Sequence, residues 1–412
     1  MRVAWLLGLA CAASFAADGT DIPVFEAKKN LSHASVRIPA LLRTTKGTLI
    51  AVAEGRDKGA DQAGNDLVVS ISRDEGASWT KPVVAYEQGK DSCNNPCLVE
   101  DTLMGRVFLF FQTFPAGSRE FGGLPAGSAD PTGTKIMVLA SDDDGATWSR
   151  PSDVTKEIKP DDAVTTASGP GIGIKMRSAT HAGRLVIPFN SQDKKRNFVN
   201  WIAFSDDGGR SWQRGGNVPQ TEGRQLNEVQ VAEARDGTLY LNSRRWKGDA
   251  FRKVSWSKDG GVTWSPAIEE AAMPDPTCQA SLLRVDRGAE THFYFLKPAG
   301  KGEEIGIVGK REPAGIVAID HRPAQQWREI AAEDCFLSKP IWSRVVEQVK
   351  VTADLKMDGA IQLAHMVSRN QPLGIEQDAL CRVQLVGEPE KPLEACAALG
   401  RSRRGEEFSL AF

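Results

Sequence analysis

Strand-like apolar runs recur along the chain, and each is followed by a polar turn of one kind. The runs at 67–71, 135–140 and 198–204 are rich in β-branched or aromatic residues, which favour half-buried pleated strands. The turns carry the pattern Ser-x-Asp-x-Gly-x-(Thr/Ser)-Trp, which occurs four times, at 72–79, 141–148, 205–212 and 257–264. The alternation of apolar run and polar turn predicts a series of β-hairpins.

Each turn has a composition that closes it locally. Serine and aspartate side chains bond nearby backbone N–H groups, glycine accepts a positive φ, and tryptophan carries a large apolar ring into the packing between units. The four turns start 69, 64 and 52 residues apart, a spacing typical of the blades of a β-propeller. We interpret the turns as devices that hold hairpins together, not as metal or catalytic sites.

Composition and charge indicate a globular protein and argue against nucleic-acid binding. The 412 residues are 41% hydrophobic and 25% charged, with 39 glycines and 22 prolines, and the formal net charge is −2. This is the profile of a globular protein with many turns. No run of lysine and arginine with interleaved aromatic residues occurs, so we expect no nucleic-acid partner. We expect one all-β domain over residues 18–412.

The first 17 residues predict an export signal. Arg2 is followed by an apolar stretch over 3–15 and by small residues around 14–17, which is the pattern of a cleaved signal peptide. A lipid-modified Cys11 is an alternative, although Gly8 stands where a larger aliphatic residue is usual. We therefore expect a secreted or periplasmic protein. No later stretch stays apolar for the roughly 20 residues that a membrane-spanning helix needs.

Metal and cofactor chemistry finds little support in the sequence. Cys93 and Cys97 have no second cysteine pair or histidine cluster nearby, the five histidines are scattered, and no glycine-rich phosphate loop occurs. We expect no metal and no organic cofactor. The six cysteines after residue 17 allow 15 disulfide patterns, among which the sequence does not choose.

Arg37 is the first candidate for ligand binding. It stands in the apolar run at 35–42 and is followed by Ile38 and Pro39. A guanidinium in such a strand costs free energy unless a carboxylate or a phosphate satisfies it. Two interpretations stay open at this point: an internal salt bridge, or an anionic ligand.

The sequence Arg37-Ile38-Pro39, followed by the four turns, resembles that of the bacterial and animal exo-sialidases. The resemblance covers roughly residues 33–297 and includes the segments 55–66, 169–174, 185–188, 227–244 and 276–281. It implies a six-bladed, sialidase-like β-propeller. It also implies an exo-sialidase that removes terminal sialic acid from extracellular sialylated glycans or glycoconjugates.

The resemblance gives a role to each of five residues. Arg37 and Arg244 would each fork onto the carboxylate of sialic acid, a planar match that lysine cannot reproduce, with Arg56 as an accessory arginine. Asp61 would protonate the leaving oxygen and later activate water. Glu228 would take the proton of a tyrosine nucleophile, which sialidases use where most glycosidases use a carboxylate.

Several neighbours compete for the same roles: Asp57 and Asp66 with Asp61, Glu233 with Glu228, and Arg245 with Arg244. Because side chains alternate along a strand, we expect only one glutamate and one arginine to face the site. Three aromatic residues could line a substrate pocket or lie in the core, and we favour the core for each: Phe111, Phe114 and Trp246.

The resemblance stops after about residue 297. Acids at 303 and 304 stand where a third carboxylate-binding arginine is expected, and Arg311 follows several positions late. The three tyrosines are Tyr86, Tyr240 and Tyr294, so none falls in the region expected to carry the nucleophile. Three hypotheses remain: a catalytically silent sialic-acid or glycan-binding propeller, an enzyme in which another residue replaces tyrosine, and a tail after about 300 outside the ancestral reading frame.

Overall fold

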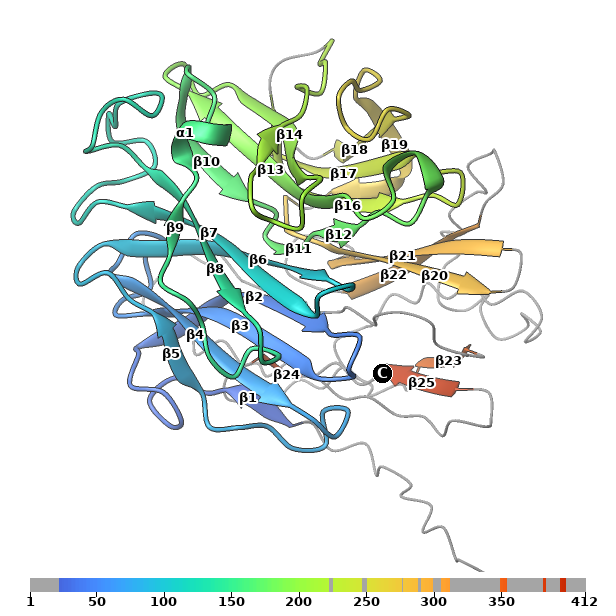
Figure 1. Cartoon of the computed structure of the whole chain (residues 1–412), viewed down its shortest axis with the longest axis horizontal. Helices are drawn as coiled ribbons and strands as arrows, with labels where there is room; N and C mark the ends of the chain where they lie inside the picture. Colours follow the sequence, from blue (N-terminus) through green and yellow to red (C-terminus); the bar gives the residue numbers. More distant parts are fainter. Residues whose placement is uncertain are drawn as a thin grey trace, which may run out of the picture.

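The computed structural model describes residues 22–221, 225–246, 250–275, 277–287, 290–298, 305–311, 349–353, 381–382 and 393–397. Within these residues, five sheets follow one another along the chain and are arranged as a fan (Figure 1). The fold is the expected all-β propeller, with successive sheets as its blades. The predicted signal peptide, residues 1–17, lies outside the described residues.

The first sheet contains β2 (Ser35–Arg43), β3 (Leu49–Arg56), β4 (Asn65–Ser72) and β5 (Val83–Tyr86). The second contains β6 (Ser92–Asp101), β7 (Arg106–Phe114), β8 (Lys135–Ser141), β9 (Ser152–Asp153) and β11 (Gly171–Ile172). The third contains β10 (Ala163–Ser168), β12 (Ile174–Lys175), β13 (Leu185–Asp193), β14 (Phe198–Ser205) and β15 (Gln213–Arg214).

The fourth sheet contains β16 (Leu226–Glu233), β17 (Leu239–Arg245), β18 (Ala250–Ser257) and β19 (Ile268–Asp275). The fifth contains β20 (Ser281–Arg287), β21 (Glu290–Pro298) and β22 (Ile305–Arg311). Two further pairs join β1 (Pro23–Phe25) to β24 (Cys381–Arg382) and β23 (Val349–Ala353) to β25 (Leu393–Ala397). The short helices are α1 (Thr155–Ile158) and the 3-10 turn η1 (Ala179–His181).

The four polar turns join β4 to β5, β8 to β9, β14 to β15 and β18 to β19, and they close as their composition predicts. In the third turn, Ser205 Oγ accepts from the Gly209 N–H at 2.8 Å and the Asp207 carboxylate accepts from the Ser211 N–H at 3.0 Å. Gly209 has a φ of 82°, which favours glycine because a Cβ is strained there. The same contacts recur in the other three turns.

The hydrophobic core lies between successive sheets, and tryptophans of the turns contribute to it. The Trp212 ring packs edge-on against Phe110 of the second sheet, with 4.6 Å between the ring centroids. Trp264 is 7% exposed and joins the core between the third and fourth sheets. The predicted role of the tryptophans in packing between units is confirmed for these two turns.

Irregular backbone interrupts the inner strands near one end of the fan. The pairing of β2 with β3 shifts register between Arg37 and Ala40, and Ile38 adopts a φ of 53°. The pairing of β6 with β7 shifts between Asn94 and Cys97, and Asn95 has a φ of 56°. Bulges of this kind redirect side chains, and the predicted functional residues lie beside them.

The expected count of six blades stays a prediction, because the region that would complete the ring falls largely outside the described residues. Cys93 and Cys97 carry free, buried thiols, so neither forms a disulfide. Among the described residues, no helix has the length and apolar character needed to cross a membrane.

Candidate active site

The predicted functional residues come from neighbouring elements of the first and fourth sheets. Arg37 lies on β2, Arg56 ends β3, and Asp61 lies in the loop that joins β3 to β4. Glu228 and Arg244 lie on the paired strands β16 and β17. The carboxylates of Asp61 and Glu228 are close enough to Arg37 to act on its pKa. The structure therefore brings both groups of residues to one site.

Arg56 joins a buried carboxylate to an exposed one. Its Nε donates to Glu54 Oε2 at 2.8 Å, and its Nη1 donates to Asp61 Oδ1 at 2.8 Å. The side chains of Arg56 and Glu54 are 1% and 0% exposed, whereas that of Asp61 is 73% exposed. Because the guanidinium bonds both carboxylates with charge-assisted hydrogen bonds, the buried Glu54 fixes Arg56, and Arg56 orients Asp61.

Glu54 was not predicted from the sequence. Its Oε1 accepts from the Asn95 N–H at 2.8 Å, which uses the unusual backbone of the bulge in β6. Burial raises the pKa of Glu54, and the charge of Arg56 and the Asn95 hydrogen bond oppose that rise. The signal that could have found it is its position two residues before Arg56, because residues two apart on a strand share one face.

The loop that carries Asp61 is held through its backbone. The carbonyl of Asp61 accepts from Asn65 Nδ2 at 2.6 Å and from Asn94 Nδ2 at 2.8 Å. Asn94 belongs to the second sheet, so the loop is anchored to two sheets at once. The carboxylate is therefore exposed to solvent while the backbone beneath it is fixed.

A second acid and guanidinium pair lies on the fourth sheet. Arg244 Nη1 donates to Glu228 Oε2 at 2.7 Å and to Asn227 Oδ1 at 3.0 Å. The side chains of Arg244 and Glu228 are 19% and 13% exposed. The buried Nε of Arg244 has no hydrogen-bond partner among the described residues. A buried donor without a partner is costly, and an anionic ligand would satisfy it.

Arg37 lies between the two pairs. Burial lowers the pKa of Arg37, the nearby charge of Arg56 lowers it further, and the carboxylates of Asp61, Glu54 and Glu228 oppose the change. A half-buried cation beside another cation is a setting in which a bound carboxylate is favoured. The nearby carboxylates keep the internal salt bridge open beside the anionic ligand, so both interpretations from the sequence stand.

A loop after β7 adds one more carboxyl group to the site. Burial and the nearby carboxylates of Asp61 and Glu228 raise the pKa of Glu120 to about 7, and the charge of Arg244 opposes this rise. The next residue, Phe121, packs on Trp246 with 5.4 Å between ring centroids. The sequence offered no signal for Glu120, because it lies in an irregular loop far from the motif residues.

The competing residues point elsewhere. Asp66 bonds His33, with 2.9 Å between Oδ2 and Nε2, and the side chain of Arg245 donates to Glu269 at 2.8 Å. Asp57 Oδ2 lies close to Gly64, within its own loop. The structure thus places Asp61 and Arg244 in the site and their neighbours outside it.

The aromatic candidates divide in the same way. Phe111 and Phe114 are 1% and 2% exposed and lie in hydrophobic clusters, as expected for core residues. Trp246 differs, because Arg244 lies over its ring at 5.9 Å and Phe121 packs against it. Trp246 is half-buried and also packs on the buried Phe198, with 4.8 Å between ring centroids, so its assignment to the core or to the site stays a prediction.

None of the three tyrosines joins this cluster. Tyr86 lies on the outer strand β5 and donates to Gln88 at 2.9 Å. Tyr240 is 1% exposed and stacks near Trp256, with 4.4 Å between ring centroids. Tyr294 lies on β21, the middle strand of the fifth sheet. Residues 303 and 304 lie outside the described residues, and Arg311 ends β22.

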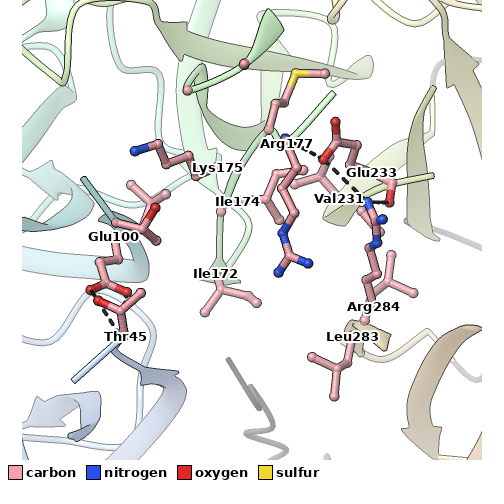
Figure 2. A pocket seen from close by; sticks show the side chains of 18 of the residues that line it. Thr45, Glu100, Ile172, Ile174, Lys175, Arg177, Val231, Glu233, Leu283 and Arg284 are labelled. Carbon is pink, nitrogen blue, oxygen red and sulfur yellow. Dashed lines mark hydrogen bonds and ion pairs between the residues drawn. The ribbon is translucent and has the colours of Figure 1, made fainter. Parts of the chain in front are cut away.

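A separate cavity of about 360 Å³ opens at the other end of the inner strands (Figure 2). Its lining includes Thr45, Glu100, Ile172, Lys175, Arg177, Glu233 and Arg284. Lys175 pairs with Asp101 at 2.5 Å, and Arg177 pairs with Asp286 at 3.1 Å. Because its cations are already paired, the cavity gives no indication of a ligand, and the predicted residues lie at the opposite end.

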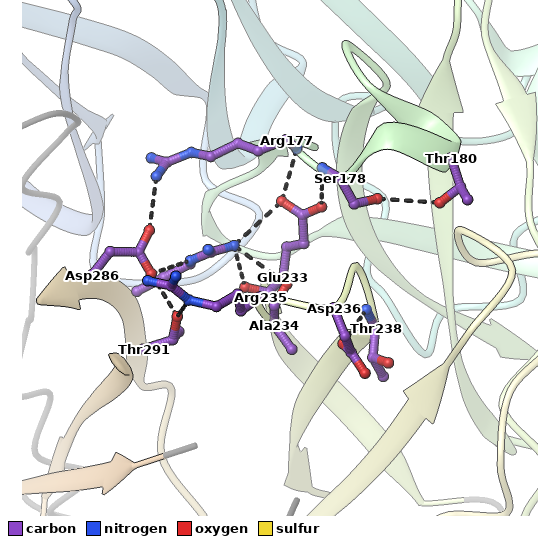
Figure 3. Close-up of polar contacts among 11 residues, drawn as sticks. Arg177, Ser178, Thr180, Glu233, Ala234, Arg235, Asp236, Thr238, Asp286 and Thr291 are labelled. Carbon is purple, nitrogen blue, oxygen red and sulfur yellow. Dashed lines mark hydrogen bonds and ion pairs between the residues drawn. The ribbon is translucent and has the colours of Figure 1, made fainter. Parts of the chain in front are cut away.

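Glu233 has a structural part beside that cavity (Figure 3). Its carboxylate accepts from the N–H groups of Arg177 at 2.8 Å and Ser178 at 2.9 Å, and its carbonyl accepts from Arg284 at 2.8 Å. Arg177 lies between β12 and β13 of the third sheet, and Arg284 belongs to the fifth. Glu233 therefore ties three sheets together, and of the two glutamates on β16 only Glu228 lies in the site.

The chain is similar to known proteins over most of the described region. Residues 47–332 match the family described as BNR repeat-like domain. A sialidase of Micromonospora viridifaciens is 35% identical over 260 residues, and an exo-alpha-sialidase of Aspergillus fumigatus is 32% identical over 282 residues. A solved structure, the Hadza microbial sialidase Hz136, aligns with a TM-score of 0.62 at 28% identity over 68% of this chain.

The match spans only part of each relative. It covers 60% of this chain and 38% of the Micromonospora protein, 64% of this chain and 64% of the Aspergillus protein, and 56% of the Hadza structure.

Among the described residues, no group of three or more histidine, cysteine, aspartate or glutamate side chains is placed to hold a metal ion.

Proposed function

We propose that this chain, which belongs to the BNR repeat-like domain family and has sialidases among its relatives, is an exo-sialidase. The observation that carries the proposal is the meeting of Arg37 with two acid and guanidinium pairs, Arg56 with Asp61 and Arg244 with Glu228. Its substrates would be sialylated glycans or glycoconjugates outside the cell. Export through the predicted signal peptide is part of the proposal.

Substrate binding would begin with the carboxylate on the anomeric carbon. Arg37 and Arg244 both present guanidinium groups, which match a carboxylate with two parallel hydrogen bonds. The buried Nε of Arg244 is a donor that such a carboxylate would satisfy. Lysine would supply the charge without the planar fork, so both positions are expected to require arginine.

Bond cleavage would depend on Asp61. Its side chain reaches solvent while Arg56 and two asparagines hold it in place. As the glycosidic C–O bond breaks, Asp61 would donate a proton to the leaving oxygen. Positive charge would develop at the anomeric carbon, beside the Glu228 carboxylate. Water would then add to that carbon from the opposite face, with the Glu228 carboxylate accepting its proton.

The group that attacks the anomeric carbon has no match among the predicted residues. Because Tyr86, Tyr240 and Tyr294 lie away from the cluster, we propose that water attacks without a covalent tyrosyl intermediate. Direct attack from the face opposite the leaving group inverts the anomeric centre, whereas a covalent intermediate retains it. Proton NMR of the first sialic acid anomer released distinguishes the two routes.

The loss of the tyrosine also favours one alternative, a propeller that binds sialic acid without cleaving it. A fluorogenic sialoside assay from acidic to neutral pH tests turnover, and calorimetric titration with free sialic acid tests binding. Arg37→Ala should abolish both, while Arg43→Ala, at the far end of the same strand, should change neither. Binding without turnover would establish the alternative, and absence of both in the wild type would contradict any sialic-acid function.

A further inference from the structure

His33 lies just before β2, behind the hairpin that carries the proposed acid. Its ring is 6% exposed, and its Nε2 lies 2.9 Å from Asp66 Oδ2. Asp66 pairs with Gly55 across β3 and β4, at the base of the loop over 57–64. The ring therefore contacts both strands at the point where the loop leaves and returns.

Alternation along β3 separates two faces of this hairpin. Glu54 and Arg56 direct their side chains toward the site, where Arg56 reaches Asp61. Gly55 and its partner Asp66 lie on the opposite face, and this is the face that His33 covers. Contacts made by His33 are thus transmitted through the strand that holds Arg56.

Gly55 is fitted to the histidine ring. A Cβ at residue 55 would lie 2.8 Å from Cγ and from Nδ1 of His33 and 2.9 Å from Cδ2. Real Cβ atoms do not approach ring atoms so closely, and the ring is confined by burial and by its bond to Asp66. The absence of a side chain at residue 55 is therefore what allows His33 to pack directly on the strand.

The loop is exposed over 57–61 and is held by polar contacts. Arg56 bonds the Asp61 carboxylate, two asparagines bond the Asp61 carbonyl, the Ser35 hydroxyl donates to the Lys58 carbonyl at 3.3 Å, and the Gly64 N–H donates to the Ser92 hydroxyl at 2.9 Å. Arg56, Gly64 and Asn65 stand where the loop leaves β3 and returns to β4, so the direction of the loop depends on how this base is packed.

We propose that His33 is a positioning residue, which sets the direction of the Asp61 loop by packing on Gly55 and bonding Asp66. The role in catalysis rests on the proposed function, in which Asp61 is the acid. It predicts a particular pattern of damage when His33 is removed. The loss falls on proton transfer to the leaving group, and binding of the substrate carboxylate by Arg37 and Arg244 is preserved.

The kinetic test compares His33→Ala with His33→Gln, whose amide can still donate to Asp66. Each is assayed on sialyl-lactose, whose leaving hydroxyl needs a proton, and on an aryl sialoside, whose acidic phenol does not. For His33→Ala we expect kcat on sialyl-lactose to fall roughly 10-fold more than kcat on the aryl substrate, with KM unchanged and partial rescue in His33→Gln. Equal losses on both substrates, or a rise in KM with kcat unchanged, would overturn the proposal.

A second test does not require activity. Hydrogen–deuterium exchange is measured on the peptide over 54–67 and on the β13–β14 hairpin, 185–205, which His33 does not touch. We expect faster exchange in 54–67 alone for His33→Ala and for Gly55→Ala, and recovery when both changes are combined, because the new methyl group then fills the space of the ring. Unchanged exchange, or equal acceleration in both peptides, would contradict a positioning role even if the wild type proved inactive.

Discussion

The guanidinium of Arg56 donates to Asp61 at 2.8 Å, although Arg56 is 1% exposed and Asp61 is 73% exposed. An exposed carboxylate usually gains little from an ion pair, because both partners keep their freedom in water. Here the guanidinium is already fixed by the buried Glu54. Asp61 is thus a solvent-facing carboxyl group on a rigid support, so its direction is fixed while it stays accessible to a substrate.

Asp61→Asn should remove turnover and leave the fold intact. The amide can accept from Arg56 but cannot donate a proton to a leaving alkoxide, so we expect kcat to fall by about 10²- to 10⁴-fold. Calorimetric titration with sialic acid should give wild-type affinity within a few-fold. A variant that hydrolyses sialyl-lactose at the wild-type rate would exclude Asp61 as the acid.

Arg56→Met should destabilise the protein severely. It leaves the buried carboxylate of Glu54 without its cation, and breaking such a pair costs about 3–5 kcal/mol. Arg106→Met is a matched control, because Arg106 pairs with Asp142 at the surface, where the side chains are 43% and 68% exposed. There we expect a loss of about 1 kcal/mol or less. Urea unfolding of both variants measures the difference, and equal losses would contradict it.

Arg244→Lys should weaken binding of sialic acid by roughly 10- to 100-fold, since the charge remains but the bidentate hydrogen bonds to a carboxylate are lost. The control is its neighbour: the Arg245 side chain bonds Glu269 away from the site, so Arg245→Lys should bind normally. Titration calorimetry gives both affinities. If the two variants bind alike, Arg244 does not hold the ligand carboxylate.

Asp207, the aspartate of the third polar turn, should make the stability of the protein depend on pH. Slight desolvation raises the pKa of Asp207, but hydrogen bonds from Ser211 and Ser205 dominate and lower it to about 2. Its stabilising contribution is therefore complete above the unfolded value of about 3.9 and is lost as pH falls through about 2. We expect Asp207→Asn to lower Tm at pH 6, and the difference from wild type to shrink between pH 4 and pH 2. A constant difference would contradict the assignment.

Glu120 should give stability the opposite pH dependence from Asp207. Burial, with the carboxylates of Asp61 and Glu228, raises its pKa to about 7, so its contribution to stability is present below about pH 4.3 and is lost as pH rises through about 7. Glu120→Gln does not ionise, and its Tm should therefore gain on that of the wild type between pH 5 and pH 8. Parallel Tm profiles over this range would show that Glu120 titrates normally.

The parts of the structure that could be predicted are those specified by short stretches of sequence. The turn Ser205–Trp212 contains every group that closes it, so pattern and hydrogen bonds agree. The motif around Arg37 also has a short-range signal, since Ile38 and Pro39 follow it. Even so, the left-handed backbone of Ile38 could not be predicted, because a β-branched side chain disfavours a positive φ.

The missed residues depend on contacts between distant segments. Glu120 reaches the site because Phe121 packs on Trp246, more than a hundred positions later. His33 contacts Asp66 through a space that exists only because residue 55 is glycine. Neither contact has a local pattern. Periodicity can say which face a residue occupies, but it cannot say which loop will lie across that face.

The polar turns have a consequence for how such a chain could have arisen. Each turn is closed by serine, aspartate and glycine within one eight-residue stretch, so it needs no neighbour to hold its shape. A unit that carries its own closure can be duplicated without first finding a partner. Gene duplication could therefore lengthen this chain blade by blade, while the ends of the inner strands remained free to acquire new chemistry.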